Sequence, residues 1–177
     1  IMGLQSGVER YIPFYRAHRE PKKEKGAFRT AIISVTISSI VIAGLLFVFS
    51  ESLAKIFHNE AIAPVLRIFS LGLPFAAVGT VLVSSLKAYQ AVKKAVIAQY
   101  YVEGFSRIVF VAVLIAFGFG LFGAVIGFIL ASIIMFLVAG FFIRKFIKKK
   151  DKYILLFKEL LPYSLPLMFS SFLYFII

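Results

Sequence analysis

Glu103 and Arg107 are the two side chains whose types and spacing point most directly to chemistry. They lie four residues apart in an otherwise apolar stretch, so on a helix they share one face and can form an ion pair. Counted from Ala95 at about 1.5 Å per residue, they lie roughly 12 and 18 Å into a hydrocarbon layer about 30 Å thick. A charge there costs about 2.5–3.5 kcal/mol unless it is paired or hydrated. The pair either neutralises itself or lines a hydrated cavity for a charged substrate or coupling ion.

Glu9 and Arg10 form a second charged position in an apolar segment. As neighbours on a helix they point in different directions, so they are poorly placed to pair with each other. Arg10 lies about 9 Å deeper than Arg16, which marks the membrane edge. It either extends back to the interface or faces a central cavity, where its guanidinium would suit a phosphate group. For Arg67, extension of the side chain to the opposite interface is the simpler interpretation.

The sequence contains no other recognisable motif for metal binding, nucleotide binding or catalysis. There is no cysteine, and His18 and His58 fall in separate loops, which excludes a thiolate or a histidine-pair metal site. The phosphate-binding motif G-x-x-x-x-G-K-[ST] is absent, as is any carboxylate cluster or Ser/His/Asp set that resembles a catalytic centre. We therefore expect no enzyme activity, no catalytic residue, no metal and no cofactor.

The stretch from Ile108 to Ile143 contains no charged residue and organises the elements around it. It is too long for one ordinary membrane crossing of about 20 residues. Glycines at its middle (Gly118, Gly120 and Gly123) offer a turn. Basic residues flank it on both sides, so the positive-inside rule requires two crossings between them.

The remaining apolar runs extend this pattern along the chain, which is 61% hydrophobic. The sequence predicts an all-α, polytopic bundle of transmembrane helices. The spans are expected at about 1–15, 30–50, 61–87, 95–118 and 121–143. Pro21 is expected to break the helix in the first loop, and Pro74 to kink the third span.

The net charge of +12 resides mainly in the connections between spans. Basic loops at 16–29, 87–94 and 144–158 alternate with nearly neutral ones, which places the basic loops in the cytoplasm. Topology alone accounts for this charge, so we do not expect nucleic acid as a partner. The chain begins and ends inside apolar segments, and we expect the natural protein to continue past both.

Four segments together resemble a known family: GLQSGVERYIPFYR, VLRIFSLGLPFAAVGTVLVSSLKAYQAVKKAV, EGFSRI with GFGLFGAVIGF, and LLPYSLPLMFSS. They are similar to polysaccharide biosynthesis membrane proteins. These are the O-antigen-flippase-like members of the multidrug/oligosaccharidyl-lipid/polysaccharide exporter superfamily.

The resemblance implies a MATE-like fold with two pseudo-symmetric lobes around a central cavity. Residues 1–143 would be the N-terminal lobe, from the end of the second helix through the sixth. Residues 144–160 would be the cytoplasmic linker between the lobes, and 161–177 the start of the seventh helix.

Cavity residues also follow from the resemblance. Arg10, with Glu9 beside it, matches the arginine of the second-helix pattern that includes Gly7 and Pro13. Glu103 and Arg107 match polar positions of the fifth helix.

The implied function is the flipping of a polyprenyl-diphosphate-linked oligosaccharide across the prokaryotic plasma membrane by alternating access. Its partners would be this substrate, membrane lipids, glycosyltransferases and a glycan polymerase. Two alternatives stay open. A cation-coupled multidrug exporter of the same superfamily would have an acidic cavity. A membrane-embedded glycan transferase or ligase would carry an acid or base on an outer loop, for which ESLAKIFHNEAIAP is the one candidate.

Overall fold

The computed structural model describes residues 2–147 and Leu156, and all regular structure in this part of the chain is helical. The helices are α1 (Met2–Ala17), α2 (Pro21–Val48), α3 (Ser50–Ile56), α4 (Ile62–Ala88), α5 (Val92–Val96), η1 (Ile97–Gly104), α6 (Phe105–Ala116) and α7 (Gly120–Ile143). The element η1 is a π-helix that joins α5 and α6 into one continuous rod. The all-α prediction is confirmed.

Four rods are long and apolar enough to cross a membrane: α2, α4, the continuous α5–η1–α6 rod, and α7. The chain is therefore a membrane protein with several crossings. The shorter α1 occupies the region of the first predicted span. The expected linker at 144–160 and the seventh helix at 161–177 lie outside the described residues, apart from residues 144–147 and Leu156.

The first connection differs from the loop predicted at 16–29. Helix α1 continues through Ala17, and α2 begins at Pro21, so most of the basic segment is helical. Pro21 begins the helix instead of breaking one, because a proline in the first turn lacks only an N–H group that would have no helical partner there. Pro74, for which a kink was predicted, lies inside the continuous helix α4.

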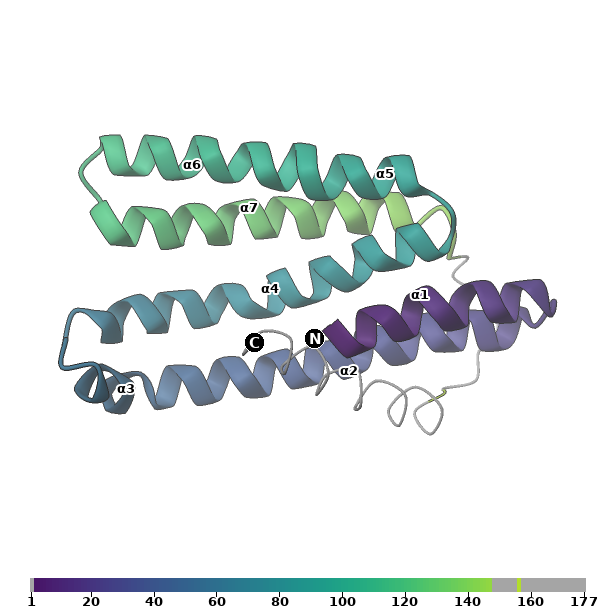
Figure 1. Ribbon diagram of the computed structural model, residues 1–177, viewed down its shortest axis with the longest axis horizontal. Coiled ribbons are helices and arrows are strands. Elements are labelled where there is room, and N and C mark those ends of the chain that lie inside the picture. Colours follow the sequence, from purple (N-terminus) through teal and green to yellow (C-terminus); the bar gives the residue numbers. More distant parts are fainter. Residues whose placement is uncertain (1, 148–155, 157–177) are drawn as a thin grey trace, which may run out of the picture.

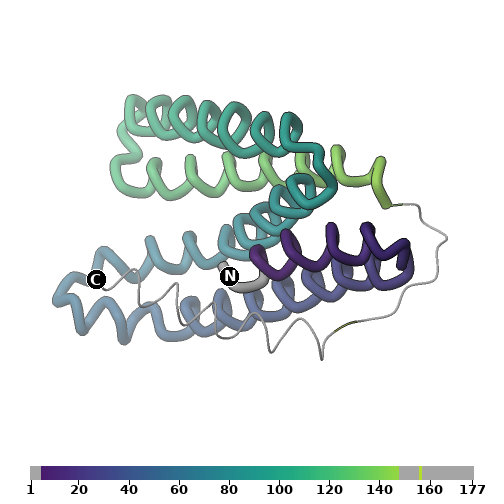
Figure 2. The backbone as a smooth tube through the Cα atoms, turned by 45° about the vertical axis from the view of Figure 1, so that its right-hand side comes forward, coloured from purple at the N-terminus to yellow at the C-terminus, as the bar shows by residue number. Residues whose placement is uncertain are grey.

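Helix α4 occupies the centre of the bundle. Figure 1 shows it between the α1–α2 pair and the pair formed by α7 and the α5–η1–α6 rod, and Figure 2 shows the same order from another side. Helix α4 packs on α1, α2 and α7, whereas α6 packs on α7 and η1. Side chains of α1, α2, α4 and α7 meet in the buried core, among them Val8, Ile12, Val35, Val81, Leu86 and Met135. Ala95 of α5 and Ala98 of η1 join the same core. Glycines permit close packing around α7: Gly72 of α4 lies against Ile129 of α7, and Gly127 of α7 lies against Val111 of α6.

Four turns connect the helices in the same way. In each, the second residue after the helix has positive φ: Arg19, His58, Gln90 and Gly118. The next N–H group donates to the carbonyl five residues back, in the bonds Glu20–Tyr15, Asn59–Ala54, Ala91–Leu86 and Phe119–Leu114. This is the Schellman arrangement, which satisfies carbonyl groups at a helix end. Each turn reverses the chain within a few residues and so keeps successive helices antiparallel.

The basic helix ends gather at one end of the bundle, which lies on the right in Figure 1. A guanidinium nitrogen of Arg16, near the end of α1, lies 3.5 Å from the carbonyl oxygen of Tyr89 and donates to it. The Tyr89 ring stacks on Phe146 with centroids 5.3 Å apart, and Lys94 Nζ lies 5.4 Å from the same Phe146 ring. The ends of α1, α4 and α7 and the start of α5 are therefore neighbours. Helix α3 and the α6–α7 turn lie at the opposite end.

Candidate functional site

The ion pair between Glu103 and Arg107 is the clearest polar feature within a membrane-spanning rod. Arg107 Nη2 donates to Glu103 Oε1 across one helical turn, as the spacing predicts. The Glu103 side chain is 14% exposed and that of Arg107 is 43% exposed. The guanidinium also lies 4.7 Å from the centroid of the Phe128 ring on α7, where a cation–π contact adds to the ion pair. The pair is thus held against α7 with the arginine partly accessible.

The backbone around this pair is unusual. Glu103 belongs to η1, and Arg107 lies in the first turn of α6. π-Helices are rare and occur often at functional sites. Within the described part of the chain, Gln99 Oε1 and Arg107 Nε are buried and have no hydrogen-bond partner. We use the name η1 site for the Glu103–Arg107 pair together with Gln99, which lies four residues before Glu103 on the same rod.

Sequence reasoning did not identify Gln99 as part of this site. The available signal was its amide side chain in an apolar stretch, four residues before Glu103. Such an amide in a membrane helix calls for hydrogen-bond partners, just as the two charged residues do.

Glu9 and Arg10 lie apart from the η1 site. Both are exposed on α1, while their neighbours Val8 and Ile12 are fully buried in the core. Helix α1 packs on α2 and α4, and among the described residues it has no contact with η1 or α6. The four predicted cavity residues therefore form two groups, separated by the central helix α4.

Arg67 reaches the end of α3. Its Nε donates to Ser50 Oγ at 3.1 Å, its Nη2 forms an ion pair with Glu51, and its guanidinium lies 5.8 Å from the Phe47 ring centroid. The side chain therefore joins α4 to the start of α3, a role that extension to the interface alone does not describe.

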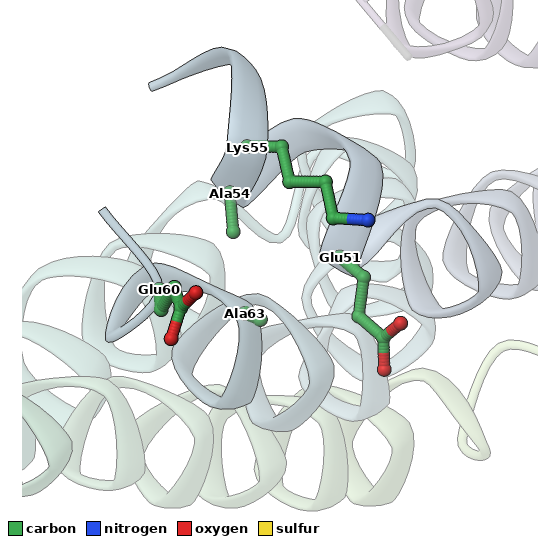
Figure 3. Close-up of a pocket in the computed structure, with 5 residues that line it drawn as sticks. All are labelled: Glu51, Ala54, Lys55, Glu60 and Ala63. Carbon is green, nitrogen blue, oxygen red and sulfur yellow. The ribbon is translucent and has the colours of Figure 1, made fainter. Parts of the chain in front are cut away.

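A shallow hollow of about 260 Å³ opens beside this joint (Figure 3). Glu51 and Lys55 border it from α3, and Glu60 borders it from the turn before α4. This is the segment named above as the candidate for an outer-loop acid or base. Among the described residues, no group of three His, Asp or Glu side chains is arranged to hold a metal ion.

Comparison with known proteins identifies the family. Residues 12–177 match the family described as polysaccharide biosynthesis protein. No curated protein and no solved structure matches the chain. The matched region runs from the middle of α1 to the last residue and includes every helix described above from α2 to α7. The chain therefore belongs to the polysaccharide biosynthesis protein family.

Proposed function

We propose that the protein flips a polyprenyl-diphosphate-linked oligosaccharide across the membrane. The observation that carries the proposal is membership of the polysaccharide biosynthesis family in a chain with four helices able to cross a membrane. The substrate is assembled on a lipid and has a charged head group that cannot cross the hydrocarbon layer unaided. A helical bundle with cations in its interior would offer that head group a path.

The η1 site supplies the chemistry for head-group binding. A guanidinium presents a planar pair of donors that matches two phosphate oxygens. In the structure the guanidinium of Arg107 is already paired with the carboxylate of Glu103. An arriving diphosphate would compete with this carboxylate, so binding and release of substrate would alternate with opening and closing of the ion pair. Arg10 on α1 would offer a second cation on the other side of α4.

Directional movement would come from alternating access. In this mechanism two lobes rock around a fixed site near the middle of the bilayer. The described bundle would be part of one lobe and residues 144–160 part of the connection to the other. No covalent bond changes, so the protein would act as a transporter, without a cofactor. Glycosyltransferases would supply its substrate, and a glycan polymerase would use the flipped product.

The test is transport by the full-length protein in proteoliposomes. A fluorescent polyprenyl-diphosphate oligosaccharide reports flipping when a membrane-impermeant quencher loses or gains access to it. Arg107→Ala and Arg10→Ala should each lower the rate by roughly tenfold, equivalent to about 1.4 kcal/mol. Arg107→Lys should fall between Ala and wild type, because lysine keeps the charge and loses the bidentate geometry.

Lys55→Ala is the matched control, since this exposed cation lies at the α3 end of the bundle. Unchanged transport in both arginine variants would reject the assignment of these residues to the cavity. Formation of new glycosidic bonds from the labelled lipid would favour the transferase alternative, and transport of lipophilic cations instead of the lipid would favour the exporter.

A further inference from the structure

Two apolar hollows lie along the contact between α2 and α4. The first, of about 430 Å³, is lined mainly by α2 and α4, with Phe28, Ile32 and Leu82 among its residues, and it is closed on one side by Phe136 and Gly140 of α7. The second, also about 430 Å³, is lined by residues that include Ile40, Gly44 and Val48 of α2 and Leu71 of α4. Both include Pro74, near the middle of α4, so the two hollows follow each other along the helix pair. We call the combined feature the α2–α4 groove.

The groove is as long as the hydrocarbon layer is thick. It follows α2 from Phe28 to Val48, which is 20 residue-to-residue steps along the helix. At about 1.5 Å per residue this distance is about 30 Å, the thickness of the hydrocarbon core of a bilayer. Helices α2 and α4 pack on each other, and Figure 1 shows them side by side from the α3 end, spreading apart toward the right where α1 lies over α2. A ligand in the groove could therefore remain in contact with the protein from one membrane surface to the other.

The groove offers no free polar group at the two hydroxyl-bearing residues of its walls, Thr36 and Ser70, because each hydroxyl is bonded to its own helix. Thr36 Oγ1 donates to the carbonyl of Ile32 at 2.7 Å, and Ser70 Oγ donates to the carbonyl of Arg67 at 2.7 Å. Both hydroxyl groups are thus satisfied by their own helices. At Gly44 there is open space, because a Cβ atom there would meet nothing within 4 Å. These walls suit a flexible hydrocarbon chain.

One end of the groove is strongly basic. Lys25 and Arg29 of α2 precede Phe28 and Ile32 by three residues each, so they lie one turn earlier on the same helix face. An amphiphile with an anionic head and a long apolar tail matches this distribution, with its head at the basic end and its tail along the groove. A soluble ligand or a peptide would not need the full length of an apolar groove.

We infer that the α2–α4 groove binds the polyisoprenoid tail of the lipid-linked substrate. The inference rests on the proposed function, since that function supplies a polyprenyl lipid. A tail that leaves the bilayer for the groove gains little hydrophobic free energy, because lipid chains are as apolar as the groove. Selectivity therefore comes from shape, with the methyl-branched chain packing against the groove walls better than a straight acyl chain does.

Photocrosslinking of the full-length protein in lipid nanodiscs tests the inference. One probe is a polyprenyl diphosphate with a diazirine in its tail, and the other is a phospholipid with the same diazirine in an acyl chain. At equal mole fraction, the isoprenoid probe should label the groove-lining parts of α2 and α4 roughly tenfold more than the phospholipid probe does. Equal labelling by the two probes would overturn the inference, because the groove would then be ordinary lipid-facing surface. Absence of labelling by either probe would overturn it as well, since another segment of the protein would then cover the groove.

Two variants sharpen the experiment. Gly44→Phe should lower isoprenoid labelling several-fold, because the ring fills open space in the groove without meeting other protein atoms. Ala112→Phe adds the same ring to an exposed position on α6, outside the groove, and should leave labelling unchanged. Equal loss in both variants would also overturn the inference.

Transport measured in parallel separates this inference from the proposed function. Preferential labelling of the groove in a protein that does not flip the lipid would leave the binding site standing and remove the proposed function. Flipping without preferential labelling would do the reverse.

Discussion

Arg67 shows how a charged side chain near a membrane surface can act as a joint between two helices. Its partner Ser50 is fully buried, and the Ser50 hydroxyl also donates to the Phe47 carbonyl at 2.8 Å. The ion pair with Glu51 is more exposed, with 43% of the arginine and 67% of the glutamate side chain accessible. The serine contact should therefore matter more than the ion pair, although only the ion pair involves two charges.

We expect Ser50→Ala to destabilise the protein by about 1–2 kcal/mol, because Arg67 Nε and the Phe47 carbonyl each lose a partner. Glu51→Gln should change the free energy of unfolding by less than about 1 kcal/mol, because exposed ion pairs contribute little. Thermal unfolding of the purified full-length protein in detergent measures both. A larger loss for Glu51→Gln than for Ser50→Ala would show that the ion pair holds α3 in place.

Tyr89 is the buried titratable group at the basic end. Burial, and then the negative charge of Glu24, raise the pKa of its hydroxyl above the usual value, against a smaller opposing effect of Arg16. An unfolded tyrosine loses its proton near pH 10, whereas the folded one retains it. The folded protein then binds the extra proton, so stability falls as the pH rises above about 10.

Tyr89→Phe should remove the part of the stability loss at alkaline pH that comes from this hydroxyl group. The comparison is the change in unfolding temperature between pH 8 and pH 11, which should be smaller in Tyr89→Phe than in wild type. Tyr101→Phe is the matched control, because it makes the same change at a side chain that is 70% exposed. An identical pH dependence in wild type and Tyr89→Phe would contradict the burial argument.

The sequence could predict contacts that are local along the chain. The Glu103–Arg107 pair follows from a four-residue spacing within one helix. The contacts of Arg67 join residues 16 and 17 positions apart and depend on how α3 folds back against α4. The spacing along one helix contains no information about that fold, and the simpler interpretation of Arg67 was therefore incomplete.

At the scale of elements, the four turns between helices share one backbone geometry but place different residue types at the position with positive φ. The four Schellman turns need a left-handed backbone, which only Gly118 provides without a side-chain penalty. Gln90 adopts φ of 61° at the corresponding place between α4 and α5. A left-handed conformation costs an ordinary residue roughly 1–2 kcal/mol, and this cost is part of the folded state.

We therefore expect opposite signs from two substitutions. Gln90→Gly should stabilise the protein by about 0.5–1 kcal/mol, because relief of the backbone exceeds the added freedom of the unfolded chain. Gly118→Ala should destabilise it by about 1 kcal/mol, because φ there is 85°. Unfolding temperatures of both variants in the same detergent provide the test. Destabilisation by Gln90→Gly would mean that the glutamine side chain has a stabilising role in the turn.

Hydropathy predicted where the long apolar rods occur, because about 20 apolar residues are needed to cross the hydrocarbon layer. It did not predict the separate helix α3, the start of α2 at Pro21, or the π-helix η1. These features depend on the backbone hydrogen bonds chosen at each position, and apolar composition does not distinguish an α-turn from a π-turn.

At the scale of the whole molecule, the arrangement of the rods was the least predictable feature. Helix α7 consists of apolar residues and glycine, apart from Ser132, so no single face of it is marked for contact. A helix that is apolar all round gives no periodic signal of its neighbours. The separation of Arg10 from the η1 site by α4 therefore emerged only from the structure.

The gathering of basic ends makes a prediction about the whole bundle. The Lys22 region, Gln90 and Lys145 all belong to connections or helix ends on the right in Figure 1, whereas Asn59 and the α6–α7 turn lie on the left. Lysine and arginine are retained on the cytoplasmic side during insertion. We therefore expect the first three positions to face the cytoplasm and the other two to face the opposite compartment.

Cysteine labelling tests this directly, because the chain contains no cysteine of its own. Single cysteines at Lys22, Gln90, Lys145, Asn59 and Phe119 would be introduced into the full-length protein after replacement of any cysteine outside this chain. In intact cells, a membrane-impermeant maleimide should label Asn59→Cys and Phe119→Cys, and label the other three only after permeabilisation. Since the helices are antiparallel and their turns are short, one position on the wrong side would require its whole helix to be reversed. Labelling of Lys22→Cys and Lys145→Cys from opposite compartments would therefore be incompatible with this bundle in a membrane and with the transport path proposed through it.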